Sequence, residues 1–179
     1  MGEWEPMLEQ MLASRYRALT AYARMLCGNE AEADDLVQDA IVATFGGLRK
    51  FEHVGQAEAY VRRAVVSRFI DARRRDQSQR RAMRVIAEAD TASGASPDLL
   101  AEHATDVGRA LATLPPRQRA CVVLRYIDHL STREVAHTLN ISEGSVKRYT
   151  ADGVARLAPL LGVPADDHDP EWQEMTVTT

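Results

Sequence analysis

The chain has little cysteine, few aromatic residues and no long apolar run, and each shortage excludes a class of protein. Its 179 residues include two cysteines and 6% aromatic residues. No stretch approaches the roughly 18 apolar residues that a membrane-spanning helix needs, so we expect no membrane insertion. The first ten residues carry three glutamates and no basic cluster, so they do not resemble a secretory signal. This favours a cytoplasmic protein. Cys27 and Cys121 lie far apart in apolar surroundings, a pattern typical of buried free thiols.

Residues for catalysis or metal binding are also scarce. The five histidines are scattered without the spacing of metal ligands, and neither cysteine has a second thiol nearby. The chain has no glycine-rich phosphate loop and no nucleophile motif. The paired carboxylates within the predicted helices lie on a helix that we expect to be exposed, where desolvation would not perturb them. The sequence therefore predicts a protein that is not an enzyme and has no catalytic residues, no metal site and no cofactor.

Charge is plentiful but segregated along the chain. The formal net charge is −4, yet residues 62–84 hold nine arginines against two aspartates, a local net charge of +7. Residues 30–39 hold five acidic residues and no basic one. Two further acidic stretches, 87–104 and 164–179, contain no lysine or arginine. Opposite charges on separate segments predict two different binding surfaces. The acidic stretches at 87–104 and 164–179 are typical of solvated connectors.

Apolar residues recur at intervals of three and four along most of the chain, and no run alternates with period two. This periodicity predicts an all-α fold of two small helical domains joined by a flexible linker. The predicted map is a first domain over 1–86, an acidic linker over 87–104, a second domain over 105–162 and an acidic tail over 163–179. Within the first domain the predicted helices cover about 7–26, 30–48 and 56–75, the last continuing as far as 86.

The second domain carries a helix-turn-helix pattern. Ser131 followed three residues later by Glu134 is the signature of a capping box that starts a helix. Asn140 tolerates the positive φ of a tight turn, and Ser142 caps a further helix. In this motif the second helix enters the DNA major groove with its first residues on base edges, here Glu143, Ser145, Lys147 and Arg148. An amphipathic helix pair within a bundle is the alternative.

The predicted helix at 30–48 has two distinct faces. At about 100° per residue, one arc collects the apolar core stripe of Leu36, Val37, Ala40, Ile41, Thr44 and Leu48. The opposite side carries an acidic patch around one apolar residue, formed by Asp35, Gln38, Asp39 and Val42. Such a patch suits docking onto a basic helical surface, with a merely solvated face as the alternative. The next helix turns Arg63, Ser67, Ile70 and Arg74 outward, and basic helices commonly contact phosphates.

Five short motifs together carry a resemblance to a known family. They are Glu32-Ala33-Asp34-Asp35-Leu36-Val37-Gln38-Asp39, Ala59-Tyr60-Val61-Arg62-Arg63-Ala64, Asp71-Ala72-Arg73-Arg74, Leu114-Pro115-Pro116-Arg117-Gln118-Arg119 and Ser142-Glu143-Gly144-Ser145-Val146-Lys147. With these motifs in this order, the chain resembles bacterial extracytoplasmic-function (ECF, group 4) RNA polymerase sigma factors of the sigma-70 family. It is most similar to their actinobacterial SigE-type subgroup. The resemblance covers about residues 8–78 and 105–161.

This resemblance implies a transcription initiation factor. Such a factor binds core RNA polymerase, directs it to promoters by reading minus-ten and minus-thirty-five elements, and aids promoter opening. The first domain would be the sigma-two domain and the second the sigma-four helix-turn-helix domain. The implied partners are promoter DNA and the beta-prime clamp helices and beta flap of core polymerase, and an anti-sigma factor is a further candidate. Polymerase binding is carried over to Asp34, Asp35, Gln38, Asp39 and Val42.

The resemblance also implies two sets of DNA-binding residues. The minus-ten set comprises Phe51, His53, Tyr60, Arg62, Arg63, Ser67, Arg73 and Arg74. Within it, the loop at 51–56 corresponds to the part that captures a flipped base, a step that costs a few kcal/mol and lets a pocket read the exposed base edge. The minus-thirty-five set comprises Arg133, Ser142, Ser145, Lys147, Arg148 and Asp152.

A helix-turn-helix regulator that binds DNA alone is the competing function. Its N-terminal domain would then serve as a sensor or a dimerisation domain. The two functions differ in one property, because a sigma factor needs polymerase for site-specific promoter binding and a repressor or activator does not.

Overall fold

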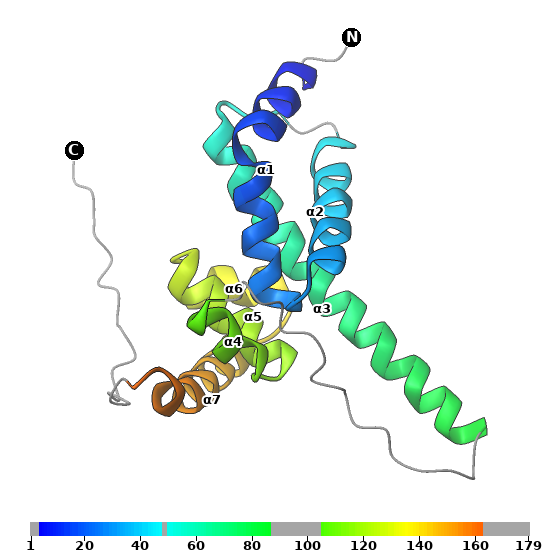
Figure 1. Cartoon of the computed structure of the whole chain (residues 1–179), viewed down its shortest axis with the longest axis vertical. Coiled ribbons are helices and arrows are strands. Elements are labelled where there is room, and N and C mark those ends of the chain that lie inside the picture. The colour runs from blue at the N-terminus through cyan, green and yellow to red at the C-terminus, as the bar shows by residue number, and fades with distance from the viewer. Residues whose placement is uncertain (1–3, 48–49, 87–104, 163–179) are drawn as a thin grey trace.

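The computed structural model describes residues 4–47, 50–86 and 105–162, and every regular element in these ranges is a helix (Figure 1). The all-α prediction is thus confirmed. The N-terminal module, as we call helices α1 to α3, and the C-terminal module, which contains the remaining elements, follow each other along the chain. Their bounds are α1 Glu5–Cys27, α2 Glu30–Phe45, α3 Val54–Ile86, α4 Asp106–Ala112, α5 Pro116–Val122, the π-helix η1 Val123–Ile127, α6 Thr132–Leu139 and α7 Glu143–Leu161.

Local caps set the helix ends of the N-terminal module. Gly28 ends α1 in the left-handed region, at φ 86°, and the Asn29 side chain then accepts from the Glu32 N–H at 2.8 Å to begin α2. Helix α3 begins at Val54, earlier than predicted, because His53 Nδ1 accepts from the Gln56 N–H at 3.1 Å and caps its first turn. Helix α2 ends at Phe45, before the predicted end, and the expected core residue Leu48 lies outside the described residues.

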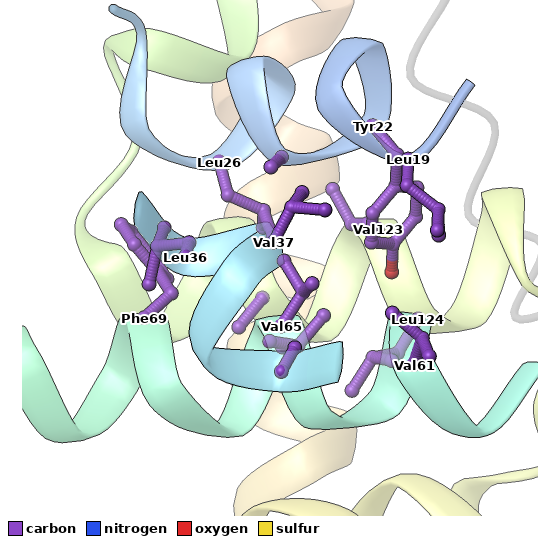
Figure 2. Packing of buried hydrophobic residues seen from close by; sticks show 14 of the residues in the cluster. Leu19, Tyr22, Leu26, Leu36, Val37, Val61, Val65, Phe69, Val123 and Leu124 are labelled. Carbon is purple, nitrogen blue, oxygen red and sulfur yellow. The ribbon is translucent and has the colours of Figure 1, made fainter. Parts of the chain in front are cut away.

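The N-terminal module is a three-helix bundle in which α1, α2 and α3 all contact one another. The predicted stripe of α2 is buried at Leu36, Val37, Ala40 and Ile41. It packs against apolar side chains of α1 and α3, such as Leu26, Val65 and Phe69 (Figure 2). Each fully buried side chain of this size stabilises the fold by about 1.5–3 kcal/mol, so this stripe fixes the orientation of α2 and places its polar face outward.

The C-terminal module packs α5 and α6 against α7, the longest helix in this half of the chain. Gly153 of α7 lies at the crossing with α5, where a Cβ atom would stand 2.7 Å from Cγ2 of Val122. Only a residue without a side chain allows this close approach. Between α5 and α6 the chain forms the single π-helical turn η1, and His129 follows it with φ 54°.

The two modules lie against each other in the structure (Figure 1). Helices α4 and α5 contact α1, and α5 and α6 contact α3. The buried apolar residues of both modules form one continuous cluster, and Val123 and Leu124 of η1 lie among side chains of α1 and α3 (Figure 2). The predicted linker at 87–104 and the predicted tail at 163–179 lie outside the described residues, and the division into domains stays a prediction.

Replacing Gly153 with alanine should destabilise the protein. Alanine favours a helix interior over glycine by about 1 kcal/mol, but the clash with Val122 should outweigh this gain and cost about 1–3 kcal/mol net. Chemical unfolding of the full chain, followed by circular dichroism, measures the difference. Gly144→Ala in the same helix is the matched control, because nothing lies within 4 Å of its added Cβ. Equal stability of the two variants would contradict the assigned crossing.

Candidate functional site

The polar face of α2 is the first candidate surface. Asp35, Gln38 and Asp39 are exposed, and Val42 keeps 70% of its surface accessible. These side chains point away from α1 and α3, as the helical count predicts. Asp34 differs from them because it is partly buried, and its Oδ1 accepts from Thr20 Oγ1 of α1 at 3.2 Å. The acidic patch on α2 is therefore open to a partner, and Asp34 fixes the first turns of the helix beneath it.

Three residues of the minus-ten set face the C-terminal module. Arg62 binds Asp128 at 3.2 Å and also Glu58, one turn earlier on α3, at 2.9 Å. Arg63 lies 3.5 Å from Glu134 of α6. Ser67 is also partly buried at this boundary, where its Oγ donates to the carbonyl of Thr138 at 3.2 Å. Although burial lowers the pKa of Arg62, the hydrogen bond and charge of Asp128 and then the charge of Glu58 raise it overall.

The two later arginines of the minus-ten set, Arg73 and Arg74, have a different environment. One guanidinium nitrogen of Arg73 donates to both carboxylate oxygens of Glu32, at 2.6 and 2.8 Å, which joins α3 to the start of α2. The same guanidinium lies 5.2 Å from the centre of the Phe69 ring. Arg74 is exposed. Of the two, Arg74 presents its charge to solvent and Arg73 contributes to packing between the helices.

Aromatic residues gather at the start of α3. The ring centres of Phe51 and Tyr60 are 5.5 Å apart, and the ring of Phe45 in α2 also lies 5.5 Å from that of Phe51. Arg63 lies 6.0 Å from the centre of the Tyr60 ring. The structure thus brings Phe51, Tyr60 and Arg63 together. His53, also predicted to bind DNA, is exposed and caps α3, a local role that its spacing from Gln56 could have indicated.

The helix-turn-helix has the predicted caps. The Ser131 side chain accepts from the Glu134 N–H at 3.2 Å, and the Glu134 carboxylate accepts from the Ser131 N–H at 2.9 Å. This backbone hydrogen bond lowers the pKa of Glu134. Asn140 follows α6 with φ 50°, and Ser142 accepts from the Ser145 N–H at 3.1 Å to start α7. The predicted capping box at Ser131, the left-handed turn at Asn140 and the helix cap at Ser142 are all confirmed.

The minus-thirty-five set lies on α6 and on the first half of α7 with its cap. Ser142, Lys147, Arg148 and Asp152 are exposed, Arg133 is exposed on α6, and Ser145 is partly buried. The buried side of α7 carries Val146, Thr150 and Leu157. Arg148 lies 5.1 Å from the centre of the Tyr149 ring, which supports its guanidinium at the surface. Lys147 and Arg148 therefore present positive charge to solvent in the first two turns of α7, where a helix N-terminus also favours phosphate binding.

Tyr22, Asp128 and Arg119 are buried polar residues that sequence reasoning missed. The Tyr22 hydroxyl donates to Asp128 at 2.5 Å, and burial followed by the Asp128 charge raises the pKa of Tyr22. Arg119 donates to the carbonyls of Leu26 in α1, Ala112 and Leu114. Burial lowers its pKa to about 10. Arg119 belongs to a motif that matched the family, and neither Tyr22 nor Asp128 had a signal in the sequence.

A pocket of about 280 Å³ lies where the modules meet beside Asp128. It is lined by Gly55, Glu58, Ala59, Arg62, Arg63, Ile127, Asp128 and Leu130. The packing at this boundary is therefore incomplete next to a buried carboxylate.

Among the described residues, none of the helices has the length and apolar character needed to cross a bilayer.

Comparison with known proteins places the two modules in one class. The family Sigma-70 region 2 matches residues 11–79, and Sigma-70, region 4 matches residues 104–157. These two regions in this order define the class of sigma-70 factors. The ECF RNA polymerase sigma factor SigM of Mycobacterium tuberculosis is 32% identical over 154 residues, which cover 86% of this chain and 76% of SigM. The RNA polymerase sigma-E factor of Streptomyces coelicolor is 30% identical over 155 residues, 86% of this chain and 85% of that factor.

The chain belongs to the extracytoplasmic-function sigma factors of RNA polymerase. It is accordingly a transcription initiation factor that directs the polymerase to promoters, in a family that is not catalytic. A solved structure, the sigma factor RpoE in complex with the anti-sigma factor NepR from Bartonella quintana, shares the fold. Its TM-score is 0.59 at 22% identity, with 87% of this chain and 97% of that chain covered.

Replacing Arg119 with methionine should cost roughly 2–4 kcal/mol of folding free energy. The substitution keeps most of the side-chain volume but leaves buried carbonyls without a charged donor, and a hydrogen bond to a charged group is worth about 1.5–3 kcal/mol. Urea unfolding of the full chain measures the loss. Arg117→Met is the matched control, because Arg117 is exposed and its replacement should change stability by less than about 0.5 kcal/mol. A similar effect of both changes would show that Arg119 is not the buried donor described.

Proposed function

We propose that the acidic patch on α2 is the surface that binds core RNA polymerase. The observation that carries this assignment is the opposition of the two faces of α2, because one face buries Leu36, Val37, Ala40 and Ile41 in the core and the other is exposed. Asp35, Gln38 and Asp39 would meet a basic surface of the beta-prime clamp helices, and Val42 would add apolar contact. Asp34 would act mainly by positioning the helix through Thr20. The beta flap would contact the C-terminal module.

Promoter reading is divided between the modules in this proposal. Residues 1–86 would act as the sigma-two domain, in which Phe51, His53 and Tyr60 receive an extruded minus-ten base and Arg62, Arg63, Ser67 and Arg74 hold nearby DNA. Arg73 would support them through its pair with Glu32. Residues 105–162 would act as the sigma-four domain. There Ser142, Ser145, Lys147, Arg148 and Asp152 would read the minus-thirty-five element from α7, and Arg133 of α6 would contact the DNA backbone.

The remaining properties follow from this role. The chain would catalyse no reaction itself, would need no metal or cofactor, and would work in the cytoplasm, where core polymerase and promoter DNA are found. An anti-sigma factor would restrain it, and the complex of the related fold with NepR supports this partner. The joint presence of regions 2 and 4 supports a polymerase-dependent factor over a regulator that binds DNA alone.

The double substitution Gln38→Arg with Asp39→Arg should weaken binding to core polymerase by at least about tenfold, which corresponds to about 1.4 kcal/mol. It places positive charge against the basic clamp surface, and it leaves the fold intact because both residues are exposed. Titration of labelled protein with core enzyme measures the affinity.

The matched control for this change is Glu9→Arg with Gln10→Arg. It makes the same exchange of one acid and one amide at exposed positions of α1. Core affinity should then stay close to that of the unmodified chain. If the α2 variant binds core polymerase as tightly as the control, the patch is not the polymerase contact.

Arg148→Ala should cost about 1–3 kcal/mol at one base pair of the minus-thirty-five element and relax the preference there. The planar guanidinium suits bidentate contact with guanine, whereas Lys147 is a point charge, so Lys147→Ala should weaken binding more evenly across sequences. Holoenzyme transcription from a library randomised upstream of the minus-ten element measures both. Arg156→Ala, an exposed arginine later in α7, serves as the control. An unchanged upstream preference in Arg148→Ala would refute base readout by this residue.

A further inference from the structure

The C-terminal end of α3 extends away from the other helices (Figure 1). Earlier in α3, Val65 and Phe69 are buried in the core, but every side chain from Arg74 to Met83 is exposed. A helix without a buried face gains no stability from apolar packing, and this one forms because it continues turns that are already packed. We call residues 74–83 the arm. Its surface is open to a partner on all sides.

The arm is strongly basic. It holds four arginines and one aspartate, a net charge of +3, in a chain whose formal net charge is −4. Arg73, just before the arm, is paired with Glu32. Among the described residues, in contrast, Arg74, Arg80 and Arg81 take part in no hydrogen bond or ion pair. The described part of the protein therefore supplies no anion to these three guanidinium groups.

These three arginines lie on one side of the arm. At about 100° per residue, Arg74, Arg80 and Arg81 fall within an arc of about 120°. Arg63, about five full turns before Arg81, points in the same direction. Arg75 points about 120° away from Arg81 and lies outside the arc. The side of α3 that carries the proposed minus-ten contact Arg63 thus continues along the arm, and we call its continuation the basic stripe.

We propose that the basic stripe of the arm binds the phosphate backbone of paired DNA in the spacer between the minus-ten and minus-thirty-five elements, without reading its sequence. The proposal rests on the DNA-binding role proposed above for α3 and deepens it, because it adds a contact with DNA outside both elements. The match to Sigma-70 region 2 ends at residue 79, so Arg80 and Arg81 lie past the part of the chain that this match covers.

The length of α3 suits this placement. Arg63 and Arg81 are 18 positions apart, which separates them by about 27 Å along the helix axis. One turn of B-DNA spans about 34 Å, so Arg81 reaches phosphates less than one turn from those at Arg63. Phe51 and Tyr60, proposed to receive an extruded base, lie at the other end of α3. The arm is therefore far from the separated strands and next to DNA that is still paired.

The composition of the arm favours phosphates of a duplex over bases. Proteins that bind single strands stack the bases on aromatic side chains, and residues 74–83 include no aromatic residue. Base readout needs a side chain held in a fixed geometry by its neighbours. Arg74, Arg80 and Arg81 have no such support among the described residues. A row of phosphates needs only charge at a suitable distance, and B-DNA carries about one charge per 1.7 Å of its axis.

An acidic protein surface is the competing partner for the basic stripe. The core of a protein interface is apolar and poor in charged residues. Met83 is 58% exposed, but it points about 160° away from Arg81. Within residues 74–83 the stripe consists of arginines and Gln77, without an apolar side chain. Charge without apolar contact suits DNA better than a protein.

Arg81→Gln tests the proposal in the holoenzyme of the full chain with core polymerase. The probe is duplex promoter DNA that the unmodified holoenzyme selects from the randomised library described above. Loss of one phosphate contact should weaken binding by up to about eightfold at 0.1 M salt. The slope of log affinity against log salt concentration should become shallower by about 0.9.

Arg75→Gln is the matched control. It removes the same charge from an exposed position of the same helix, outside the basic stripe, and should leave both the affinity and the slope unchanged. Circular dichroism checks that both variants keep their helix content. Equal slopes for Arg81→Gln and Arg75→Gln would overturn the proposal.

Two changes in the DNA locate the contact. Uncharged methylphosphonate linkages throughout the spacer should abolish the difference between Arg81→Gln and the unmodified chain. A difference that persists on this DNA would place the contact elsewhere and overturn the proposal. Scrambling the base sequence of the spacer should leave the effect of Arg81→Gln as it was. An effect that depends on the spacer sequence would show base readout and would also overturn it.

Two further results separate the remaining explanations. Titration with core polymerase should give the same affinity for Arg81→Gln as for the unmodified chain, and a weaker affinity would make the arm a protein contact and overturn the proposal. Failure of the unmodified holoenzyme to select any promoter would refute the proposed function and the role of the arm with it. Selection of a promoter followed by equal salt slopes would overturn the role of the arm alone.

Discussion

The arrangement of the described residues depends on how the arginines of α3 are paired with acidic residues. One side of this helix is apolar and packs on α1 and α2 through residues such as Val61, Val65 and Phe69. The adjoining side begins with Arg62 and Arg63, whose guanidinium groups cannot lie at a boundary without anions or water. Asp128 and Glu134 satisfy this requirement from the C-terminal module. The position of that module on α3 therefore follows from pairing charge as well as from burying apolar surface.

Features encoded by neighbouring residues could be predicted from the sequence. The caps at Ser131 and Ser142 and the left-handed turn at Asn140 involve partners within a few positions, so spacing alone indicates them. The exposed face of α2 follows from the same helical count that defines its buried stripe. These local rules, with the order of the five motifs, are sufficient to predict the all-helical fold, the polar face of α2 and the helix-turn-helix of α6 and α7.

Pairings between distant segments could not be predicted in the same way. Tyr22 and Asp128 are separated by 106 positions, and Arg73 and Glu32 by 41, so no periodicity relates them. The π-turn that directs Asp128 has no sequence signature that we recognise. A row of arginines on a helix predicts a need for anions but does not identify which anions satisfy it. The family resemblance groups Arg62, Arg63 and Arg73 in one DNA-binding set, although the structure gives them different partners.

The ambiguity of those arginines has a physical origin. A buried carboxylate and a DNA phosphate satisfy a guanidinium group through the same charge-assisted hydrogen bonds, so one side chain can serve both an intramolecular boundary and a nucleic-acid surface. The two uses exclude each other in space but not in sequence. Removing one partner from a buried charge pair is costly because it leaves a charge without a counterion, whereas another anion in the same place can keep that charge paired. The charged contacts at this boundary can thus in principle be exchanged for contacts with a polyanion, whereas the apolar contacts around Val123 and Leu124 offer no such exchange.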